Sequence, residues 1–171
     1  MKIAPFSGVI ALACALVLAL SCTKESAPAE DANEALELRG PTVPFHGEYT
    51  VYPQTVSEEN GIVTLILPAE GVATHLGNSQ WFSNSQANFN TLPPIQTGDM
   101  EFTAANGAKL YGHFEGTGTP NPDGSLSGEG NYWITGGDGR FSGYTGSGAY
   151  HFTVSTENIG TLFFDGTLTK P

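Results

Sequence analysis

Short apolar and aromatic runs alternate with turn residues along most of this chain. Between residues 45 and 171, no segment repeats its apolar residues with the period of 3.6 that marks an amphipathic helix. The runs are rich in β-branched and aromatic residues and end at glycine, proline, asparagine or aspartate, which is typical of strands joined by turns. The pattern predicts an all-β protein of about eight strands, over 45–52, 62–67 continuing after a bend through 72–76, 80–88, 100–104, 108–117, 125–134, 143–155 and 160–168.

Apolar and polar side chains also alternate within single runs. In residues 109–116, one face carries Leu110, Gly112, Phe114 and Gly116, and the other face carries Lys109, Tyr111, His113 and Glu115. Residues 149–154 repeat this two-residue period. One apolar face and one mixed face fit either a sandwich or a closed barrel, and closure would also remove exposed sheet edges.

Glycine marks the connections. The Asn106-Gly107 pair is a strong hairpin-turn signal, and residues 119–124 form a longer loop of turn residues. The densest glycine cluster lies within residues 132–150, between two aromatic runs. Because glycine allows tight turns and close backbone approach, this cluster indicates backbone geometry rather than reactive chemistry.

The first residues resemble an export signal. Lys2 supplies a positive start, and the apolar run over 9–20 has the length of a signal-peptide core rather than that of a membrane span. The run ends at Ala19-Leu20-Ser21-Cys22, which resembles a bacterial lipoprotein cleavage box. We therefore expect a signal peptide over 1–21 and lipidation of Cys22. An ordinary secretory signal or an uncleaved anchor is the alternative.

The expected organisation is a signal, a tether and one domain. Residues 22–44 are rich in Ser, Ala, Pro and acidic residues and predict a flexible, lipid-anchored tether, while residues 45–171 suffice for a single β domain. No Asp follows Cys22, so the expected location is the outer membrane, with surface exposure as one option and a secreted or periplasmic protein as the other.

Charge and cysteine content exclude several classes. The formal net charge is −11, which disfavours binding to nucleic acid or to an anionic membrane surface. Cys14 and Cys22 are the only cysteines, so the domain itself has no disulfide and no thiolate ligand. The four histidines show no metal-site spacing, and we expect no metal and no cofactor.

The glycine cluster also resembles a known signature. Residues 136–141 (GGDGRF), followed by Gly143 and Gly146, look like the glycine signature of the allene oxide cyclase-like barrels, which include the dirigent proteins. Residues 73–77 and 102–107 are similar to segments of uncharacterised bacterial exported relatives. This resemblance implies an eight-stranded antiparallel β-barrel with a cavity for a small hydrophobic ligand, often in a homotrimer.

The chain departs from the reactive members of that superfamily. Thr145 stands where dirigent proteins usually carry Arg, and their early-strand acidic residue has no clear counterpart, since only Glu48 is acidic in that region. Arg140 occupies a variable, often basic position of the signature and is expected at a turn surface. The resemblance therefore favours the fold and disfavours catalysis.

The residues leave a short set of candidate sites. The weak acid–base candidates are Glu48, His75, His113 and Glu115, because proton transfer needs a group that titrates near the working pH. The candidate ligand-binding residues are His75, Tyr111, His113 and Trp133. Hydrogen-bonded strand residues on a solvated face are the simpler interpretation of most of these.

Three functions remain open from the sequence. The leading hypothesis is a non-enzymatic envelope barrel that binds a small apolar ligand or a protein partner. The second is an isomerase or cyclase that acts in the barrel cavity, which requires at least two of the acid–base candidates to line one pocket. The third is a structural envelope or adhesion module, favoured if side chains fill the barrel completely and the aromatic residues form an exposed patch.

Overall fold

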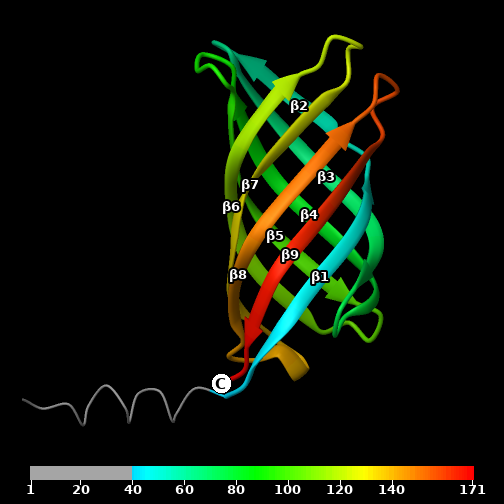
Figure 1. Ribbon diagram of the computed structural model, residues 1–171, viewed down its shortest axis with the longest axis vertical. Coiled ribbons are helices and arrows are strands. Elements are labelled where there is room, and N and C mark those ends of the chain that lie inside the picture. The colour runs from blue at the N-terminus through cyan, green and yellow to red at the C-terminus, as the bar shows by residue number, and fades with distance from the viewer. Residues whose placement is uncertain (1–39) are drawn as a thin grey trace, which may run out of the picture.

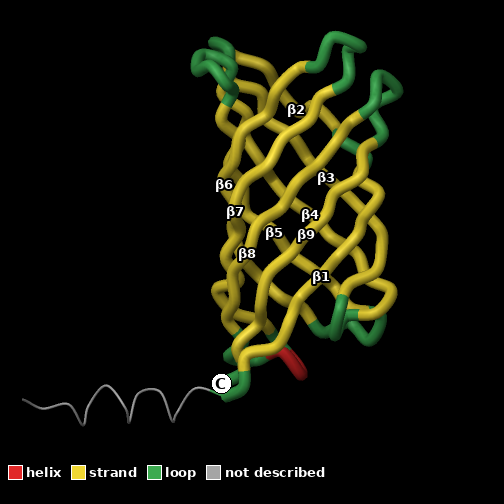
Figure 2. The backbone as a smooth tube through the Cα atoms, viewed as in Figure 1, coloured by secondary structure: helices red, strands yellow, loops and turns green. Residues whose placement is uncertain are grey.

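The computed structural model describes residues 40–171, which form a β-barrel (Figures 1 and 2). Within this range no helix is long and apolar enough to cross a membrane. The elements are β1 (Thr42–Val51), β2 (Gln54–Glu59), β3 (Ile62–Ala73), β4 (Gly77–Asn88), β5 (Ile95–Ala104), β6 (Lys109–Pro120), β7 (Leu126–Gly137), the short helix η1 (Gly139–Phe141), β8 (Thr145–Val154) and β9 (Gly160–Thr169).

Eight strands close the barrel. Every strand pairs antiparallel with its neighbours in the order β1-β9-β8-β7-β6-β5-β4-β3, and β1 also pairs with β3, which joins the two ends of the sheet. The ninth strand, β2, continues the direction of β1 after Tyr52-Pro53 and pairs with the first half of β3. All six residues of β2 are exposed, so this strand adds a rim to one end of the barrel (Figure 1).

The structure confirms the all-β class and the eight-stranded antiparallel barrel. Several boundaries differ from expectation. The barrel starts at Thr42, within the expected tether, and β3 runs without a bend to Ala73, where a turn replaces the end of the expected strand over 72–76. The strand β2 was not expected, because its sequence QTVSEE has almost no apolar content. The expected signal over 1–21, Cys22 and most of the tether lie outside the described residues.

The two ends of the barrel differ in packing. The end that holds the first residue of β1 and the last residue of β9 is called here the closed end, because inward side chains fill it. Phe45, Phe102, Leu110 and Leu168 are there fully buried. The opposite end, with β2 and the β4–β5, β6–β7 and β8–β9 loops, is called the open end, and it lies at the top of Figure 1. This end contains the cavity described below.

Inward-facing glycines shape the wall formed by β6, β7, β8 and β9. Three cross-strand glycine pairs face each other in register, Gly116 with Gly130, Gly118 with Gly128, and Gly148 with Gly166. A Cβ at Gly130 would lie 2.8 Å from Cε1 of Tyr150, so the glycine lets the tyrosine ring lie against the wall. Apart from Gly118, where a Cβ would make only ordinary contacts, these positions need glycine for close approach rather than for an unusual backbone angle.

Gly148 tests this interpretation of the wall. A Cβ there would lie 2.6 Å from the Cα of Gly166 and 2.8 Å from the carbonyl carbon of Asp165, both backbone atoms that no rotamer change can move. We expect Gly148→Ala to lower the free energy of unfolding in urea by about 1–3 kcal/mol. A Cβ at Gly136 has no atom within 4 Å, so Gly136→Ala should stay within about 0.5 kcal/mol. Equal stability of the two variants would contradict close packing at Gly148.

Candidate functional site

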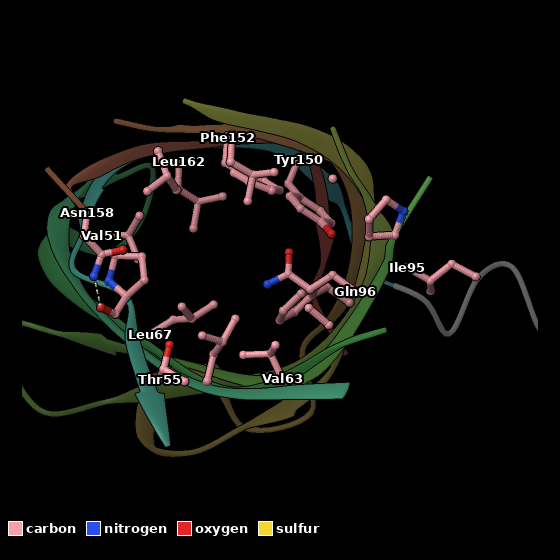
Figure 3. A pocket seen from close by; sticks show the side chains of 18 of the residues that line it. Val51, Thr55, Val63, Leu67, Ile95, Gln96, Tyr150, Phe152, Asn158 and Leu162 are labelled. Atoms are coloured by element: carbon pink, nitrogen blue, oxygen red, sulfur yellow. Dashed lines mark hydrogen bonds between the residues drawn. The ribbon is translucent and has the colours of Figure 1, made fainter. Parts of the chain in front are cut away.

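A cavity of about 310 Å³ occupies the open half of the barrel (Figure 3). Strands on all sides of the barrel contribute to it, and the β4–β5 and β8–β9 loops border its mouth. Most of its lining side chains are apolar, and the apolar ones include Val51, Val63, Leu65, Leu67, Ala87, Phe89, Ile95, Leu126, Phe152, Val154 and Leu162. A volume near 300 Å³ lies at the lower end of the range for small-molecule sites.

Four aromatic rings form the floor of the cavity. Trp81 and Phe114 have ring centroids 6.2 Å apart, Phe114 and Tyr150 5.4 Å, Tyr150 and Phe164 6.3 Å, and Phe164 and Trp81 5.8 Å. The contacts therefore close into a ring across the barrel interior. Since all four residues are buried, and Phe164 also packs on the aromatic core below, the floor is held rigidly.

The walls are built partly from rings that lie flat. Tyr150 and Phe152 stack with their planes 13° apart, and Phe152 lies over Gly128 of the neighbouring strand. Gly118 lines the same part of the cavity, and a Cβ there would make only ordinary contacts, 3.5 Å from Cδ1 of Leu126 and 3.9 Å from the Phe152 ring. Gly118 is therefore a lining position that accepts a Cβ.

Few polar groups reach the cavity. The amide of Gln96, on β5, points toward its centre (Figure 3). Asn158 also lines the cavity, but its Nδ2 donates a hydrogen bond to the carbonyl oxygen of Pro53 at 2.6 Å, which ties the β8–β9 loop to β2. Thr55 and Glu58 contribute from β2, and both are exposed. The site is an apolar chamber with one half-buried amide inside and polar groups at its edge.

Two further polar atoms belong to the floor residues but are covered. The indole Nε1 of Trp81 and the hydroxyl of Tyr150 are buried and have no hydrogen-bond partner among residues 40–171. Burial raises the pKa of Tyr150 above the usual range for tyrosine, and the Glu115 charge adds to the effect. These groups therefore contribute ring surface to the cavity, and Tyr150 stays neutral at ordinary pH.

Apolar side chains also surround the mouth. Seven of the eleven large hydrophobic residues that are exposed in residues 40–171 lie on the strands and loops of the open end, namely Tyr52, Val56, Ile62, Phe89, Leu92, Ile95 and Ile159. Leu92 is 96% exposed. Concentrated exposed apolar surface is a common mark of a binding site, and here it borders the cavity entrance.

The candidate residues of the β6–β7 pair lie on the outer surface. Tyr111, His113 and Trp133 project outward, and none of them lines the cavity. His113 and Trp133 are register partners whose rings stack at 5.0 Å. The Tyr111 hydroxyl donates a hydrogen bond to Asp138 at 2.9 Å, which raises the pKa of Tyr111. The structure brings the three together as an exposed aromatic strip.

The remaining candidates are also exposed and also lie away from the cavity. Glu48 projects outward from β1, and Glu115 lies beside His113 in a shallow polar groove on the outer surface. His75 occupies the β3–β4 turn at the closed end, with a left-handed φ of 66°, and its Nε2 lies 3.2 Å from the carbonyl oxygen of Pro44. Arg140 of η1 donates a hydrogen bond to the carbonyl oxygen of His75 at 2.6 Å. Of the four acid–base candidates, only His113 and Glu115 come together.

Sequence reasoning missed the residues that line the cavity. Gln96 precedes the expected start of its strand, since β5 begins at Ile95 rather than at Met100, and the expected strand over 62–67 does not show which way Leu65 and Leu67 face. Alternation identifies two faces but does not say which face turns inward. One signal was available in the sequence. Phe114 and Tyr150 lie on the apolar faces of their strands, and these faces turn inward.

No metal site is evident within the part of the chain that the structure describes. No three His, Cys, Asp or Glu side chains in residues 40–171 gather closely enough to hold an ion.

The fold and the cavity together define a class of protein: a closed antiparallel β-barrel whose open half is a small apolar chamber. No protein-family model matches this chain, and no curated protein matches it significantly.

Proposed function

We propose that this chain is a non-enzymatic binding barrel that takes a small apolar molecule into the cavity of its open half. The single observation that supports this most strongly is the uneven packing of the barrel. Side chains fill the closed end, whereas about 310 Å³ at the open end is lined mainly by apolar groups. An eight-stranded barrel is just wide enough to be filled by side chains or to hold one small ligand.

The size of the cavity limits the ligand. With about 310 Å³, the cavity lies at the lower end of the range of about 300–1,000 Å³ for small-molecule sites, so it fits a ligand at the small end of drug size. Burying apolar surface contributes roughly 25 cal/mol per Å², and a preformed chamber avoids the cost of opening a space. The rigid aromatic floor and the apolar rim support a site that is ready to bind.

Binding is favoured over conversion because the acid–base candidates lie elsewhere. Glu48, His75, His113 and Glu115 are all exposed and none lines the cavity. Proton transfer needs a group within hydrogen-bond reach of the reacting atom. Among residues 40–171, Glu58 is the only carboxylate in contact with the cavity, and it is exposed on β2.

The proposal includes attachment to the cell envelope through a lipid on Cys22. The polypeptide chain joins the barrel at the closed end, where β1 begins at Thr42. The mouth of the cavity therefore lies at the opposite end from this junction (Figure 1). A tether at that end would leave the mouth accessible. The resemblance to the allene oxide cyclase-like barrels supports the same kind of cavity, and we propose membership of that superfamily and a homotrimeric assembly on this ground.

A cavity-filling variant tests the proposed function. N-phenyl-1-naphthylamine, a neutral dye that fluoresces in apolar surroundings, should bind to the wild-type domain with saturation. Gly118→Leu places a side chain in the chamber at a position that accepts a Cβ. We expect it to weaken dye binding at least tenfold while the fold is kept, as measured by fluorescence titration and circular dichroism.

The matched control is the same substitution outside the cavity. Gly136 lies near the closed end of β7, where a Cβ meets nothing within 4 Å, and it does not line the chamber. Gly136→Leu should bind the dye like the wild type. If the wild type does not bind the dye, or if Gly118→Leu binds it as tightly as Gly136→Leu, the cavity is not the binding site.

A further inference from the structure

The polar lining of the cavity carries information about the chemistry of the ligand. Inside the chamber, the amide of Gln96 points toward the centre (Figure 3) and makes no hydrogen bond with any residue of 40–171. The amide of Asn158 is already engaged with Pro53. The indole N–H of Trp81 and the hydroxyl of Tyr150 are covered, so a ligand cannot touch them.

We infer that the ligand is an uncharged apolar molecule that carries one hydroxyl or carbonyl oxygen, and that Gln96 recognises this oxygen. This inference rests on the proposed function and specifies its ligand. A primary amide both donates and accepts hydrogen bonds, so it can pair with a ketone, an ester or an alcohol. In an apolar surrounding, an amide that pairs with the ligand also avoids the cost of remaining unpaired.

Charge excludes the anionic alternative. Among residues 40–171, the cavity is lined by no lysine, arginine or histidine, and its one ionisable carboxylate, Glu58, would repel a second. Moving an ionised carboxylate from water into an apolar chamber without a cation is strongly unfavourable. The formal net charge of −11 acts in the same direction. Fatty-acid anions are therefore poor ligands for this site, although their chains would fit.

Three ligands with the same octyl chain separate these possibilities. They are 2-decanone, 2-methyl-1-decene, in which C=CH₂ replaces C=O, and nonanoate, which is a carboxylate at pH 7. Each is small enough for a cavity of about 310 Å³. Their affinities are measured by displacement of N-phenyl-1-naphthylamine from the domain. We expect the ketone to bind about threefold to tenfold more tightly than the alkene, and nonanoate to bind at least tenfold more weakly than the ketone.

Gln96→Leu removes the amide and keeps an apolar side chain of similar size. We expect it to weaken 2-decanone about threefold to tenfold and to leave 2-methyl-1-decene unchanged or slightly tighter, so that the preference for the ketone disappears. Gln80→Leu is the matched control, because Gln80 lies on the outward face of β4 and should keep the preference. Urea unfolding of both variants checks that the fold is intact.

The two proposals fail in different ways. If Gln96→Leu keeps the wild-type preference for the ketone, or if nonanoate binds as tightly as 2-decanone, the inference about Gln96 and the uncharged ligand is overturned while binding in the cavity stands. If Gly118→Leu lowers the affinity for none of the three ligands, or if none of them displaces the dye from the wild type, the proposed function itself is overturned. If Gln96→Leu loses the preference for the ketone and Gln80→Leu keeps it, the result supports both the proposed function and the inference about Gln96.

Discussion

Replacing Phe164 with alanine is expected to lower the free energy of unfolding by about 3–5 kcal/mol. Phe164 is 3% exposed and joins the cavity floor to the closed-end core. Its ring contacts five others, at centroid distances between 5.0 and 6.3 Å, namely those of Tyr49, Trp81, Phe102, Tyr132 and Tyr150. Because these rings are fixed by their own strands, they cannot collapse into the space left behind. Urea unfolding followed by circular dichroism measures the effect.

The adjacent residue provides the control. Phe163 has the same side chain on the same strand but projects outward, where its ring stacks on His151 at 4.7 Å. We expect Phe163→Ala to cost about 1 kcal/mol or less. Similar losses for the two variants would contradict the inward orientation of Phe164 and with it the position of the floor.

The second large effect is a loss of stability at alkaline pH. Burial raises the pKa of Tyr49 to about 12, although its hydrogen bond with Ser79, 2.8 Å long, acts in the opposite direction. Burial also raises the pKa values of Tyr132 and Tyr150, with smaller contributions from the charges of Asp165 and Glu115. In the unfolded chain these hydroxyls ionise near pH 10.

The sign follows from proton binding. Above about pH 10 the unfolded chain releases protons that the folded barrel still holds, so the free energy of unfolding falls as pH rises. For Tyr49 alone, the loss between pH 10 and its folded pKa of about 12 is on the order of 2–3 kcal/mol. Urea unfolding at a series of pH values should show this decline, and Tyr49→Phe should flatten it. A free energy of unfolding that stays constant up to pH 12 would contradict burial of these hydroxyls.

The sequence was sufficient to predict the fold class because the barrel is encoded locally. The two-residue alternation around Phe114 and Tyr150 sets strands with one apolar face, and turn residues such as Asn106 and Gly107 set their ends. From β2 to β9, each strand pairs antiparallel with the strand that follows it, which is the simplest connection, and β1 closes the barrel by pairing with β9 and β3. The apolar pattern could not predict β2, because this strand is stabilised by pairing with β3 and buries no side chain.

The site could not be predicted because it depends on curvature and register. Tyr111, His113 and Trp133 alternate with inward residues, and only closure of the sheet decides that their face is the outer one. The cavity exists because residues from the ends of distant strands, such as Val51, Gln96 and Leu162, converge on one opening. No local pattern marks this convergence. A polar residue that faces inward, such as Gln96, can be recognised as unusual only after the inner face of the sheet is known.

The central claim is that the open half of the barrel holds a small apolar molecule, and Trp81 reports on it directly. The chain has two tryptophans, of which Trp81 lies in the cavity floor and Trp133 on the outer surface. In a Trp133→Phe domain, titration with 2-decanone should change Trp81 emission with one-to-one saturation, and adding Gly118→Leu should abolish the change. No saturable change, or the same change with Gly118→Leu present, would contradict the account.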